Sequence, residues 1–293
     1  MKGIILAGGT GSRLWPITKG VSKQLLPVYD KPLIHYPLST LMMTGIREIV
    51  IVTTPKDLGA FQTLLGDGQG IGISIEYVEQ IEPKGIAEAF ILAEKQIENE
   101  KTCLILGDNI FHGVGLGTQL NRFTNVVGAQ IFGYRVSNPS DYGVAEFDRD
   151  GNVISIVEKP LNPRTNIAIP GIYFYDENVL EYANELKPSN RNELEITDLN
   201  RIYLEKKSLN IQIFPRGTAW LDTGTFNSLH DASSYIRALE ERQGSKISCI
   251  EEIAFRNGWI SAIELEKIAL QFPANNFGKY LLTLIDSSNP FSW

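Results

Sequence analysis

The stretch 2-KGIILAGGTGSRLWP-16 begins with a short apolar run and passes directly into a glycine-rich turn. The run 2-KGIILA-7 predicts a buried strand, because it is short, apolar and bounded by a turn. Glycines after such a strand let the backbone approach a phosphate, and their N–H groups can bind an anion. A tight strand-to-helix turn without a ligand is the structural alternative. The stretch therefore predicts a phosphate site at the carboxyl end of the first strand, where open parallel sheets bind ligands.

Strands and helices alternate along the chain to about residue 135. Short apolar runs rich in β-branched residues predict strands, and the amphipathic patterns between them predict helices. The further strands are EIVIVTT (48–54), ISIEYVE (73–79), TCLILG (102–107) and AQIFGYRV (129–136), and the helices lie within 31–45, 57–68 and 86–98. This alternation predicts a mainly parallel sheet with helices on both faces.

From about residue 140 the predicted strands lie closer together, which is typical of antiparallel structure. They are YGVAEFD (142–148), GNVISIVE (151–158) and GIYFYD (171–176), with a turn at 148–152. Helices are predicted at 177–186, 193–207, 226–244, 249–258 and 261–272, and one more strand, LNIQIFP (209–215), leads to AWLDTGT (219–225). The chain therefore predicts one large α/β domain with an embedded antiparallel portion and a helical end.

Composition narrows the classes of function. The 293 residues are 43% hydrophobic and 21% charged, which is ordinary for a globular protein with a large core. The net charge of −7 argues against a broad nucleic-acid surface, because such surfaces are basic. No signal peptide is visible and no run of about 18 apolar residues occurs, so no membrane span is expected. Cys103 and Cys249 fit neither a disulfide framework nor a zinc site, which favours a cytoplasmic setting.

Two familiar nucleotide fingerprints fail in the glycine turn. The Rossmann pattern G-x-G-x-x-G, started at Gly9, needs a third glycine where Leu14 stands. The second strand also ends in 53-TTP-55, without the acidic residue that this pattern expects. The P-loop pattern needs Gly-Lys-Ser/Thr, which the turn lacks. A dehydrogenase is therefore a distant alternative, and P-loop hydrolysis is disfavoured.

Two cations accompany the turn instead. Arg13 offers a planar fork of donors that suits bidentate phosphate binding, and Lys23 adds a compact second charge. One phosphate needs little of this, whereas a triphosphate spreads its charge over three groups and would engage both cations. The turn thus predicts a triphosphate site.

With Arg13 and Lys23, the sequence resembles the sugar nucleotidyltransferases (sugar-phosphate pyrophosphorylases). The motifs that carry the resemblance occur in order along most of the chain. They are GIILAGGTGSRLWPIT (3–18), SKQLLPVYDKPLIHYPLSTLM (22–42), LLGDG (64–68), LILGDNIF (104–111), YGVAEFD (142–148), EKP (158–160), GIYFYD (171–176), ELEITDLNR (193–201), AWLDTGT (219–225) and EEIAFRNGWI (251–260). The glycine motif alone is typical of the superfamily, whereas the combination resembles the branch that couples dTTP to glucose 1-phosphate.

The resemblance implies a Rossmann-like, three-layer α/β fold with a mainly parallel (mixed) sheet, an embedded antiparallel sugar-binding portion and a helical C-terminal segment. The expected α/β domain covers residues 1–240, with a nucleotide-binding part at about 1–135 and a sugar-binding part at about 136–225. Residues 241–293 are expected to form the C-terminal segment, with oligomer or regulatory contacts. The implied reaction converts dTTP and glucose 1-phosphate into dTDP-glucose and pyrophosphate, with Mg²⁺, in a homotetramer that serves synthesis of deoxysugars such as dTDP-rhamnose.

This chemistry places few demands on acid–base groups. A sugar-phosphate oxygen attacks the α-phosphorus of the nucleotide, and this nucleophile is already ionised. Catalysis is then positioning and charge neutralisation, which calls for cations and metal ligands rather than a catalytic triad. The three histidines, His35, His112 and His230, are accordingly interpreted as structural.

Asp108 and Asp222 each lie beside a predicted strand end and a glycine, so their carboxylates are candidates to converge. A turn or N-cap aspartate is the structural alternative for each. Mg²⁺ prefers one or two carboxylates together with phosphates and waters. The resemblance assigns both residues to this metal, where it would align the phosphates for in-line displacement.

The resemblance assigns the remaining site residues by motif. Those implied in catalysis are Arg13, Lys23 and Lys159. Those implied at the nucleotide are Leu6, Gly8, Gly9, Thr10, Gly11, Ser12, Arg13, Lys23, Gln24, Gln80, Pro83, Gly85 and Asp108, and those at the sugar phosphate are Asn109, Gly143, Glu158, Lys159, Gly171 and Arg191. A surface ion pair is the structural alternative for Glu158 and Lys159. Gln80 can donate to and accept from a pyrimidine edge.

Two positions and one stretch depart from the family pattern. Lys84 stands where relatives carry aspartate, beside the base-selecting Gly85, and Asn192 stands where relatives carry glycine, beside Arg191. Arg256 matches a family position at a regulatory site near subunit contacts, while an exposed helix arginine is the alternative. The stretch 113-GVGLG-117 differs from relatives there, which affects the expected regulation more than the catalysis.

Other functions stay open at this point. A uridylyl- or cytidylyltransferase acting on the same sugar phosphate is the alternative within the enzyme class, because thymine and uracil differ by one methyl group. A non-catalytic regulator that binds nucleotide sugars is the alternative outside that class.

Overall fold

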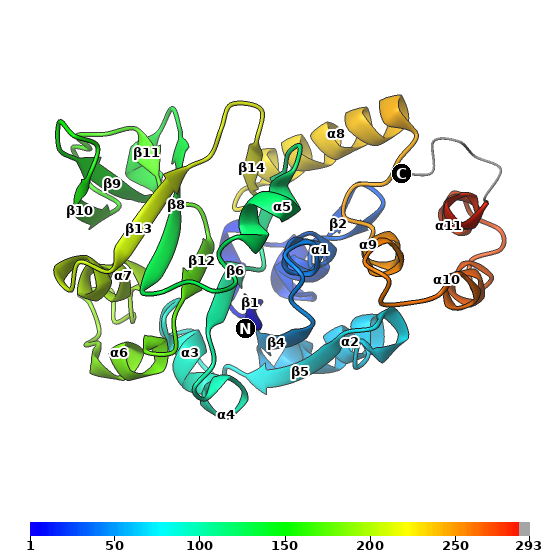
Figure 1. Cartoon of the computed structure of the whole chain (residues 1–293), viewed down its shortest axis with the longest axis horizontal. Coiled ribbons are helices and arrows are strands. Elements are labelled where there is room, and N and C mark those ends of the chain that lie inside the picture. Colours follow the sequence, from blue (N-terminus) through cyan, green and yellow to red (C-terminus); the bar gives the residue numbers. More distant parts are fainter. Residues whose placement is uncertain (287–293) are drawn as a thin grey trace.

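A ten-stranded mixed sheet spans the computed structural model, which describes residues 1–286 (Figure 1). Its strands follow the order β10-β9-β11-β8-β12-β6-β1-β4-β5, and β13 also pairs with β8. They are β1 (Lys2–Leu6), β4 (Glu48–Thr53), β5 (Ser74–Glu79), β6 (Thr102–Leu106), β8 (Ala129–Arg135), β9 (Gly143–Phe147), β10 (Val153–Glu158), β11 (Ile167–Ala168), β12 (Ile172–Tyr175) and β13 (Leu209–Ile213). In Figure 1, β9 and β10 lie at one end of the molecule and the last helices at the other.

The parallel part of the sheet sets the position of the glycine turn. β1 pairs in parallel with β4 on one side and with β6 on the other, and Leu6 lies opposite both Val52 and Leu106. The three strands therefore end at the same level. The turn after β1 and the residues after β6 are neighbours at the carboxyl edge of the sheet, where ligands of such folds bind.

The antiparallel part begins at β12. This strand pairs antiparallel with both β6 and β8, and β9, β10 and β11 extend the sheet with further antiparallel pairs. β13 then returns parallel to β8. The predicted antiparallel structure is thus an extension of one continuous sheet.

Helices cover both faces of the sheet, as the near-continuous apolar strands require. They are α1 (His35–Met43), α2 (Pro55–Leu65), α3 (Glu88–Leu92), α4 (Glu94–Ile97), α5 (Leu116–Asn121), α6 (Val179–Glu185), α7 (Ile196–Glu205), α8 (Phe226–Gln243), α9 (Ile250–Arg256), α10 (Ala262–Ala269) and α11 (Asn276–Ile285). Ile5 of β1 joins a core with α1, α2, α5 and α9 to α11, whereas its neighbour Ile4 joins a second core with α3, α4, α6 and α7. This alternation along one strand separates the two faces.

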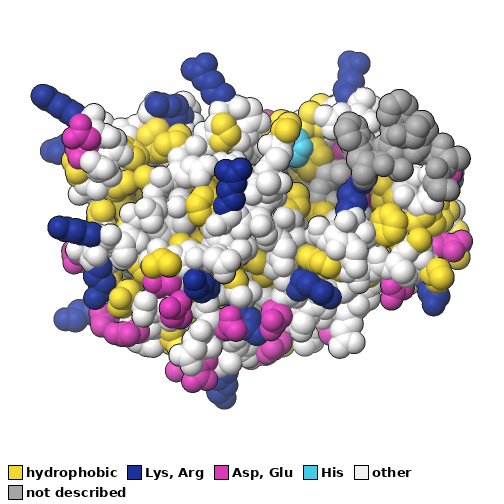
Figure 2. Space-filling view, in the orientation of Figure 1, with side chains coloured by type: hydrophobic (Ala, Val, Ile, Leu, Met, Phe, Trp, Pro, Cys, Tyr) yellow, Lys and Arg dark blue, Asp and Glu magenta, His cyan; other side chains and the backbone are white. Residues whose placement is uncertain are grey.

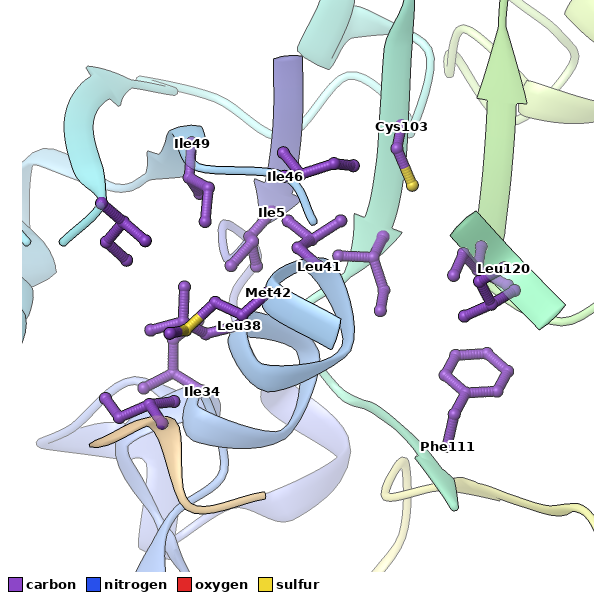
Figure 3. Close-up of a cluster of buried hydrophobic side chains, with 14 of the residues drawn as sticks. Ile5, Ile34, Leu38, Leu41, Met42, Ile46, Ile49, Cys103, Phe111 and Leu120 are labelled. Atoms are coloured by element: carbon purple, nitrogen blue, oxygen red, sulfur yellow. The ribbon is translucent and has the colours of Figure 1, made fainter. Parts of the chain in front are cut away.

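The first of these cores is drawn in Figure 3. Leu38, Leu41 and Met42 of α1 gather there with Ile5 of β1 and Cys103 of β6. All five side chains are fully buried. The helix α1 is therefore fixed against the same strands that carry the glycine turn and the residues after β6.

Two short antiparallel ladders lie beside the main sheet. β7 (Asn109–His112) pairs with β14 (Ala219–Asp222), and β2 (Pro27–Val28) pairs with β3 (Lys31–Pro32). A third apolar cluster joins β2, β7 and α8 through Val28, Ile110, Ala232 and Ile236. The ladders bring segments from distant parts of the sequence to the edge where the glycine turn lies.

The structure confirms the predicted mainly parallel, three-layer α/β arrangement. It differs from expectation within 31–45, where β3 precedes a helix that begins at His35, and within 86–98, which divides into α3 and α4 at Ala93. β2, β7, β11, α5 and α11 were not among the predicted elements. The proposed boundary at residue 240 stays a prediction; α8 continues to Gln243, and residues 287–293 of the expected C-terminal segment lie outside the described residues.

Figure 2 shows Lys and Arg side chains scattered over one face of the molecule, with Asp and Glu side chains among them and no continuous basic patch on the part described. This distribution agrees with the net charge of −7. Within residues 1–286, none of the helices combines the length and the apolar character that a membrane crossing needs.

Candidate active site

The glycine turn forms a cradle at the end of β1. Gly9 and Gly11 adopt left-handed backbone angles, with φ of 109° and 58°, which favour glycine. Thr18 Oγ1 donates a 2.7 Å hydrogen bond to the carbonyl of Gly11, and the buried Leu14 anchors the short helix that follows. Arg13, between these anchors, is exposed. The turn lines a cavity of about 240 Å³ together with Lys23, Gln24, Asp108 and Gly224.

Every residue of the turn that the sequence assigned to the nucleotide lines this cavity: Gly8, Gly9, Thr10, Gly11, Ser12 and Arg13. Successive backbone amides with a cation at their side are suited to an anion. Trp15, which received no role from the sequence, is exposed.

Lys23 and Asp108 form the central ion pair. Lys23 Nζ lies 2.7 Å from Asp108 Oδ2, and Lys23 is only 9% exposed. Burial by itself would raise the pKa of Asp108, but the charge and hydrogen bond of Lys23, the hydrogen bond of Asn109 and the charge of Arg13 together hold that pKa below its ordinary value. Asp108 is therefore ionised at neutral pH and holds the lysine at the mouth of the glycine cradle.

The β7–β14 ladder brings Asp222 to Asp108. Asp222 lies opposite Asn109 in the register, and the backbone N–H and hydroxyl of Thr223 both donate to the Asp108 carbonyl, at 3.2 and 2.9 Å. Burial and the charge of Asp108 raise the pKa of Asp222. Two neighbouring carboxylates that repel one another are a suitable pair for a divalent cation. Within residues 1–286 no cluster of three or more His, Cys, Asp or Glu side chains forms a metal cage, so the other ligands would be phosphates and waters.

Asn109 aligns Asp108 through a fixed set of hydrogen bonds. Its Nδ2 donates to Asp108 Oδ1 at 2.9 Å, while its Oδ1 accepts from Trp220 Nε1 at 2.6 Å and from the Gly171 N–H at 3.1 Å. These partners leave Asn109 buried and its amide in one orientation. A β-carbon on Gly171 would lie 2.9 Å from Asn109 Oδ1 and 2.5 Å from Leu106 Cδ1, so the chain needs glycine there.

A second cavity, of about 280 Å³, adjoins the first. Of the residues that the sequence assigned, Leu6, Gly8, Arg13, Gln24, Asp108, Asn109, Gly143, Glu158, Lys159, Gly171 and Asp222 line it. Glu158 ends β10, where Thr197 Oγ1 donates to its Oε2 at 2.6 Å. Lys159 follows with a left-handed φ of 41°, an unusual conformation for a residue with a side chain that is often found at functional sites. The two cavities share Gly8, Arg13, Gln24 and Asp108.

Arg191 lies beside the second cavity but is not part of its lining. Its guanidinium donates to both carboxylate oxygens of Glu195, at 3.0 and 2.7 Å, and lies 3.1 Å from Glu193 and 3.8 Å from Glu158. Burial would raise the pKa of Glu195, but the hydrogen bonds from Arg191 and Ser189 lower it. Carboxylates therefore hold Arg191 close to Glu158, which lines the second cavity. Asn192, which follows Arg191, has a left-handed φ of 60°.

The remaining residues assigned to the nucleotide, Gln80, Pro83 and Gly85, lie in the loop after β5 and line neither cavity. Gln80 is 2% exposed and adjoins Gly8, whereas Pro83 is exposed. Gly85 has a φ of 107°, and a β-carbon there would lie 2.4 Å from the Leu194 carbonyl oxygen. Close packing against residue 194 is therefore one reason for this glycine. Its neighbour Ile86 lines the second cavity.

The sequence missed several residues of the second cavity. Tyr142, Thr197, Asn200 and Trp220 line it without having been singled out. The rings of Tyr142 and Trp220 lie 5.0 Å apart, and Asn200 accepts a 2.6 Å hydrogen bond from Tyr175 while its Nδ2 has no partner among the described residues. The sequence offered one signal for these residues: they stand near Gly143, Ile196 and Asp222 in the motifs that carry the family resemblance.

Arg256 lies apart from both cavities. It lines a third one, of about 260 Å³, with Phe111, His112, Gly113 and Leu116, and donates to Glu252 at 2.7 Å. His112, interpreted as structural, bonds there through Nδ1 to the Tyr235 hydroxyl at 3.0 Å. Of the other histidines, His35 has a buried Nε2 and His230 is exposed.

Comparison with known proteins agrees with this geometry. The model of the family described as nucleotidyl transferase matches residues 2–238. A glucose-1-phosphate thymidylyltransferase from Mycolicibacterium smegmatis is 54% identical over 286 residues, covering 98% of this chain and 99% of the relative. One from Xanthomonas campestris is 55% identical over 284 residues, covering 97% and 96%.

Solved structures show the same fold. A protein from Bacillus anthracis, assigned as a glucose-1-phosphate thymidylyltransferase and crystallised with sucrose, is 42% identical and has a TM-score of 0.75, over 81% of this chain and 95% of that one. A UDP-glucose pyrophosphorylase in complex with UDP-glucose is 27% identical, with a TM-score of 0.69 over 83% and 99%. By sequence and by structure, the chain belongs to the nucleotidyl transferase family and groups with its glucose-1-phosphate thymidylyltransferases.

Proposed function

We propose that this enzyme transfers a thymidylyl group from dTTP to glucose 1-phosphate, giving dTDP-glucose and pyrophosphate. The observation that carries the proposal is that the two cavities adjoin, with Arg13, Gln24 and Asp108 lining both. A triphosphate in the glycine cradle and a sugar phosphate near Lys159 would meet where the cavities adjoin. The reaction joins these two substrates through their phosphates.

The chain's own residues act by position and charge. The glycine turn would hold the triphosphate through its backbone amides, and Arg13 and Lys23 would neutralise the departing pyrophosphate. Lys159 would bind the phosphate of the sugar, and Glu158, oriented by Thr197, would accept hydrogen bonds from sugar hydroxyls. The nucleophile is an ionised phosphate oxygen, so no side chain is needed as a general base.

Asp108 and Asp222 are the residues that would hold Mg²⁺. When bound, the metal would supply Lewis-acid stabilisation of the charge on the transferred phosphate. The raised pKa of Asp222, caused by burial and by Asp108, supports this assignment, because a cation between them would relieve their repulsion. Asn109 would hold the Asp108 carboxylate in place for it.

The other assigned residues divide between the substrates. Leu6, Gln24, Gln80, Pro83 and Gly85 would surround the nucleoside, and Asn109, Gly143, Gly171 and Arg191 would serve the sugar side. Arg191 would reach the sugar phosphate only by exchanging part of its contact with Glu195. We also propose a cytoplasmic homotetramer that supplies dTDP-rhamnose synthesis, with Arg256 in a regulatory site formed by the third cavity.

Uridylyl transfer is a second candidate, because a UDP-glucose pyrophosphorylase shares the fold at 27% identity. One methyl group separates thymine from uracil and is worth about 1–3 kcal/mol in an apolar pocket. Some turnover of UTP is therefore compatible with the preferred use of dTTP.

The test is an assay of pyrophosphate release with Mg²⁺. dTTP, UTP, CTP and GTP are each combined with glucose, galactose or mannose 1-phosphate. We expect the highest kcat/KM for dTTP with glucose 1-phosphate, and a loss of about 10²-fold or more in Arg13→Ala. Arg149→Ala, at an exposed turn, is the control and should keep wild-type turnover.

Two outcomes would count against the proposal. Absence of pyrophosphate release with every triphosphate, together with tight dTDP-glucose binding, would indicate a non-catalytic regulator. A higher kcat/KM with UTP or CTP would move the assignment to the uridylyl- or cytidylyltransferases.

A further inference from the structure

The side chain of Gln80 is held in one orientation by a neighbouring glutamate. Gln80 Nε2 donates a 2.7 Å hydrogen bond to Glu88 Oε2, and the Lys84 backbone N–H donates to the same oxygen at 3.0 Å. An ionised carboxylate only accepts hydrogen bonds, so the amide must turn its NH₂ group toward Glu88. A flipped amide would place two acceptor oxygens at hydrogen-bond distance with no proton between them.

The opposite end of the amide lies against the glycine turn. A β-carbon on Gly8 would lie 2.1 Å from Gln80 Oε1, which shows that this oxygen lies against the glycine turn. Gly8 lines both active-site cavities. Gln80 is 2% exposed, and none of residues 1–286 donates a hydrogen bond to Oε1. The amide therefore presents an unpaired acceptor toward the turn that would hold the nucleotide.

A fixed acceptor at this place discriminates among pyrimidines. Thymine and uracil carry an N3–H donor, whereas the N3 of cytosine is an acceptor. An amide free to flip could satisfy either edge, but one locked by a carboxylate can satisfy only the donor. We infer that Glu88 is a specificity-determining positioning residue, which selects thymine and uracil over cytosine by fixing the amide of Gln80.

This inference rests on the proposed function and deepens it, because it names the residue that sets one part of the nucleotide choice. Neither Glu88 nor Gln80 lines a cavity, but Gln80 lies against Gly8, which lines both, so Glu88 would act through Gln80. The inference also predicts the limit of this base selection. The fixed amide of Gln80 distinguishes bases by the group at N3 and not by the methyl group at C5, so it does not separate dTTP from dUTP.

The experiment compares dUTP with dCTP, which share the deoxyribose and both lack the methyl group. The ratio of their kcat/KM values with glucose 1-phosphate is measured in wild type, Glu88→Gln and Glu88→Ala. We expect the dUTP/dCTP ratio to fall about tenfold or more in Glu88→Ala. It should fall less in Glu88→Gln, since a carboxamide can still accept from Gln80 in one of its two orientations. The dTTP/dUTP ratio should stay within about twofold of wild type in both.

Glu82→Gln is the matched control. Glu82 lies in the same loop and forms an ion pair with Lys84 at 3.6 Å, so the change removes the same charge without altering a contact of Gln80. Its dUTP/dCTP ratio should equal that of wild type. If a Glu88 variant loses turnover, titration calorimetry gives the ratio of the dissociation constants of dUTP and dCTP, which is compared with the same ratio in wild type.

An unchanged dUTP/dCTP ratio in Glu88→Ala would overturn the inference, as would an equal fall in Glu82→Gln. Failure of the proposed function is seen separately, because wild type would then release no pyrophosphate from dTTP.

Discussion

His35 links the stability of the fold to pH through a single side chain. It begins α1, and its Nε2 is buried with no hydrogen-bond partner among the described residues. Burial, with a smaller contribution from the charge of Lys31, lowers its pKa to about 4. The unfolded chain binds this proton near pH 6.5, whereas the folded chain binds it only near 4. Protonation between these values therefore favours unfolding.

We expect the free energy of unfolding to fall by up to about 3 kcal/mol from this residue as the pH drops from about 6.5 to 4. Urea unfolding of His35→Phe should show a shallower dependence on pH over that range. His230→Phe, at an exposed position on α8, is the control and should keep the wild-type dependence. Equal slopes in wild type and His35→Phe would refute this assignment.

Single residues also show what the sequence could predict of the site. Arg13 and Lys23 stand in or near a glycine motif whose phosphate chemistry is local, so the sequence was sufficient to select them. Tyr142 and Trp220 depend on a ring contact of 5.0 Å between distant segments. No local pattern encodes such a contact. The hydrogen bonds of Asn109 likewise exist only once β7 and β14 have paired.

At the scale of elements, a buried charge cluster joins the β2–β3 hairpin to the end of α8. Glu240 is 5% exposed and accepts from Lys31 at 3.0 Å, from Lys246 at 2.7 Å and from the Ile247 N–H at 2.9 Å. Lys31 and Lys246 also pair with Asp30, and these pairs outweigh the effect of burial and lower its pKa. The cluster therefore ties the start of the C-terminal segment to the chain that follows Lys23.

Removing the charge of Glu240 should leave Lys31 buried with too little compensation. We expect Glu240→Gln to lower the free energy of unfolding by about 3 kcal/mol in urea denaturation. Glu241→Gln changes the next residue, which is exposed and forms a surface ion pair with Arg237 at 3.7 Å. This change should lower the free energy of unfolding by less than about 1 kcal/mol. Similar losses in the two variants would show that the cluster is no stronger than a surface pair.

Elements that follow local periodicity were predicted well, and those that depend on partners were not. The central strands are apolar runs bounded by turns, and each formed where expected. The segment 31–45 has a helical pattern throughout, yet β3 forms at its start because residues 31 and 32 pair with β2. The expected helix at 86–98 breaks at Ala93, whose φ of −90° and ψ of 13° lie outside the helical range. β7 has four residues, too few to show a period.

Across the whole molecule, the C-terminal helices share a core with the main sheet. Ala254 of α9, Leu265 of α10 and Leu281 of α11 belong to the same buried cluster as Ile5 of β1 and Cys103 of β6. A continuous core transmits the loss of packing at one end to the other. The helices α9 to α11 should therefore unfold together with β1 and β6, whose ends lie at the glycine turn.

Leu281→Ala tests this coupling, because Leu281 is fully buried and lies in the last described helix. Deleting its methyl groups should lower the free energy of unfolding by about 3 kcal/mol. Hydrogen exchange at increasing urea should show the amides of α11 and of β1 losing protection in one transition, shifted equally by the substitution. Leu282→Ala, at a neighbouring position that is 38% exposed, should shift that transition much less. Loss of protection in α11 at lower urea than in β1 would instead mean that the C-terminal segment unfolds as an independent unit.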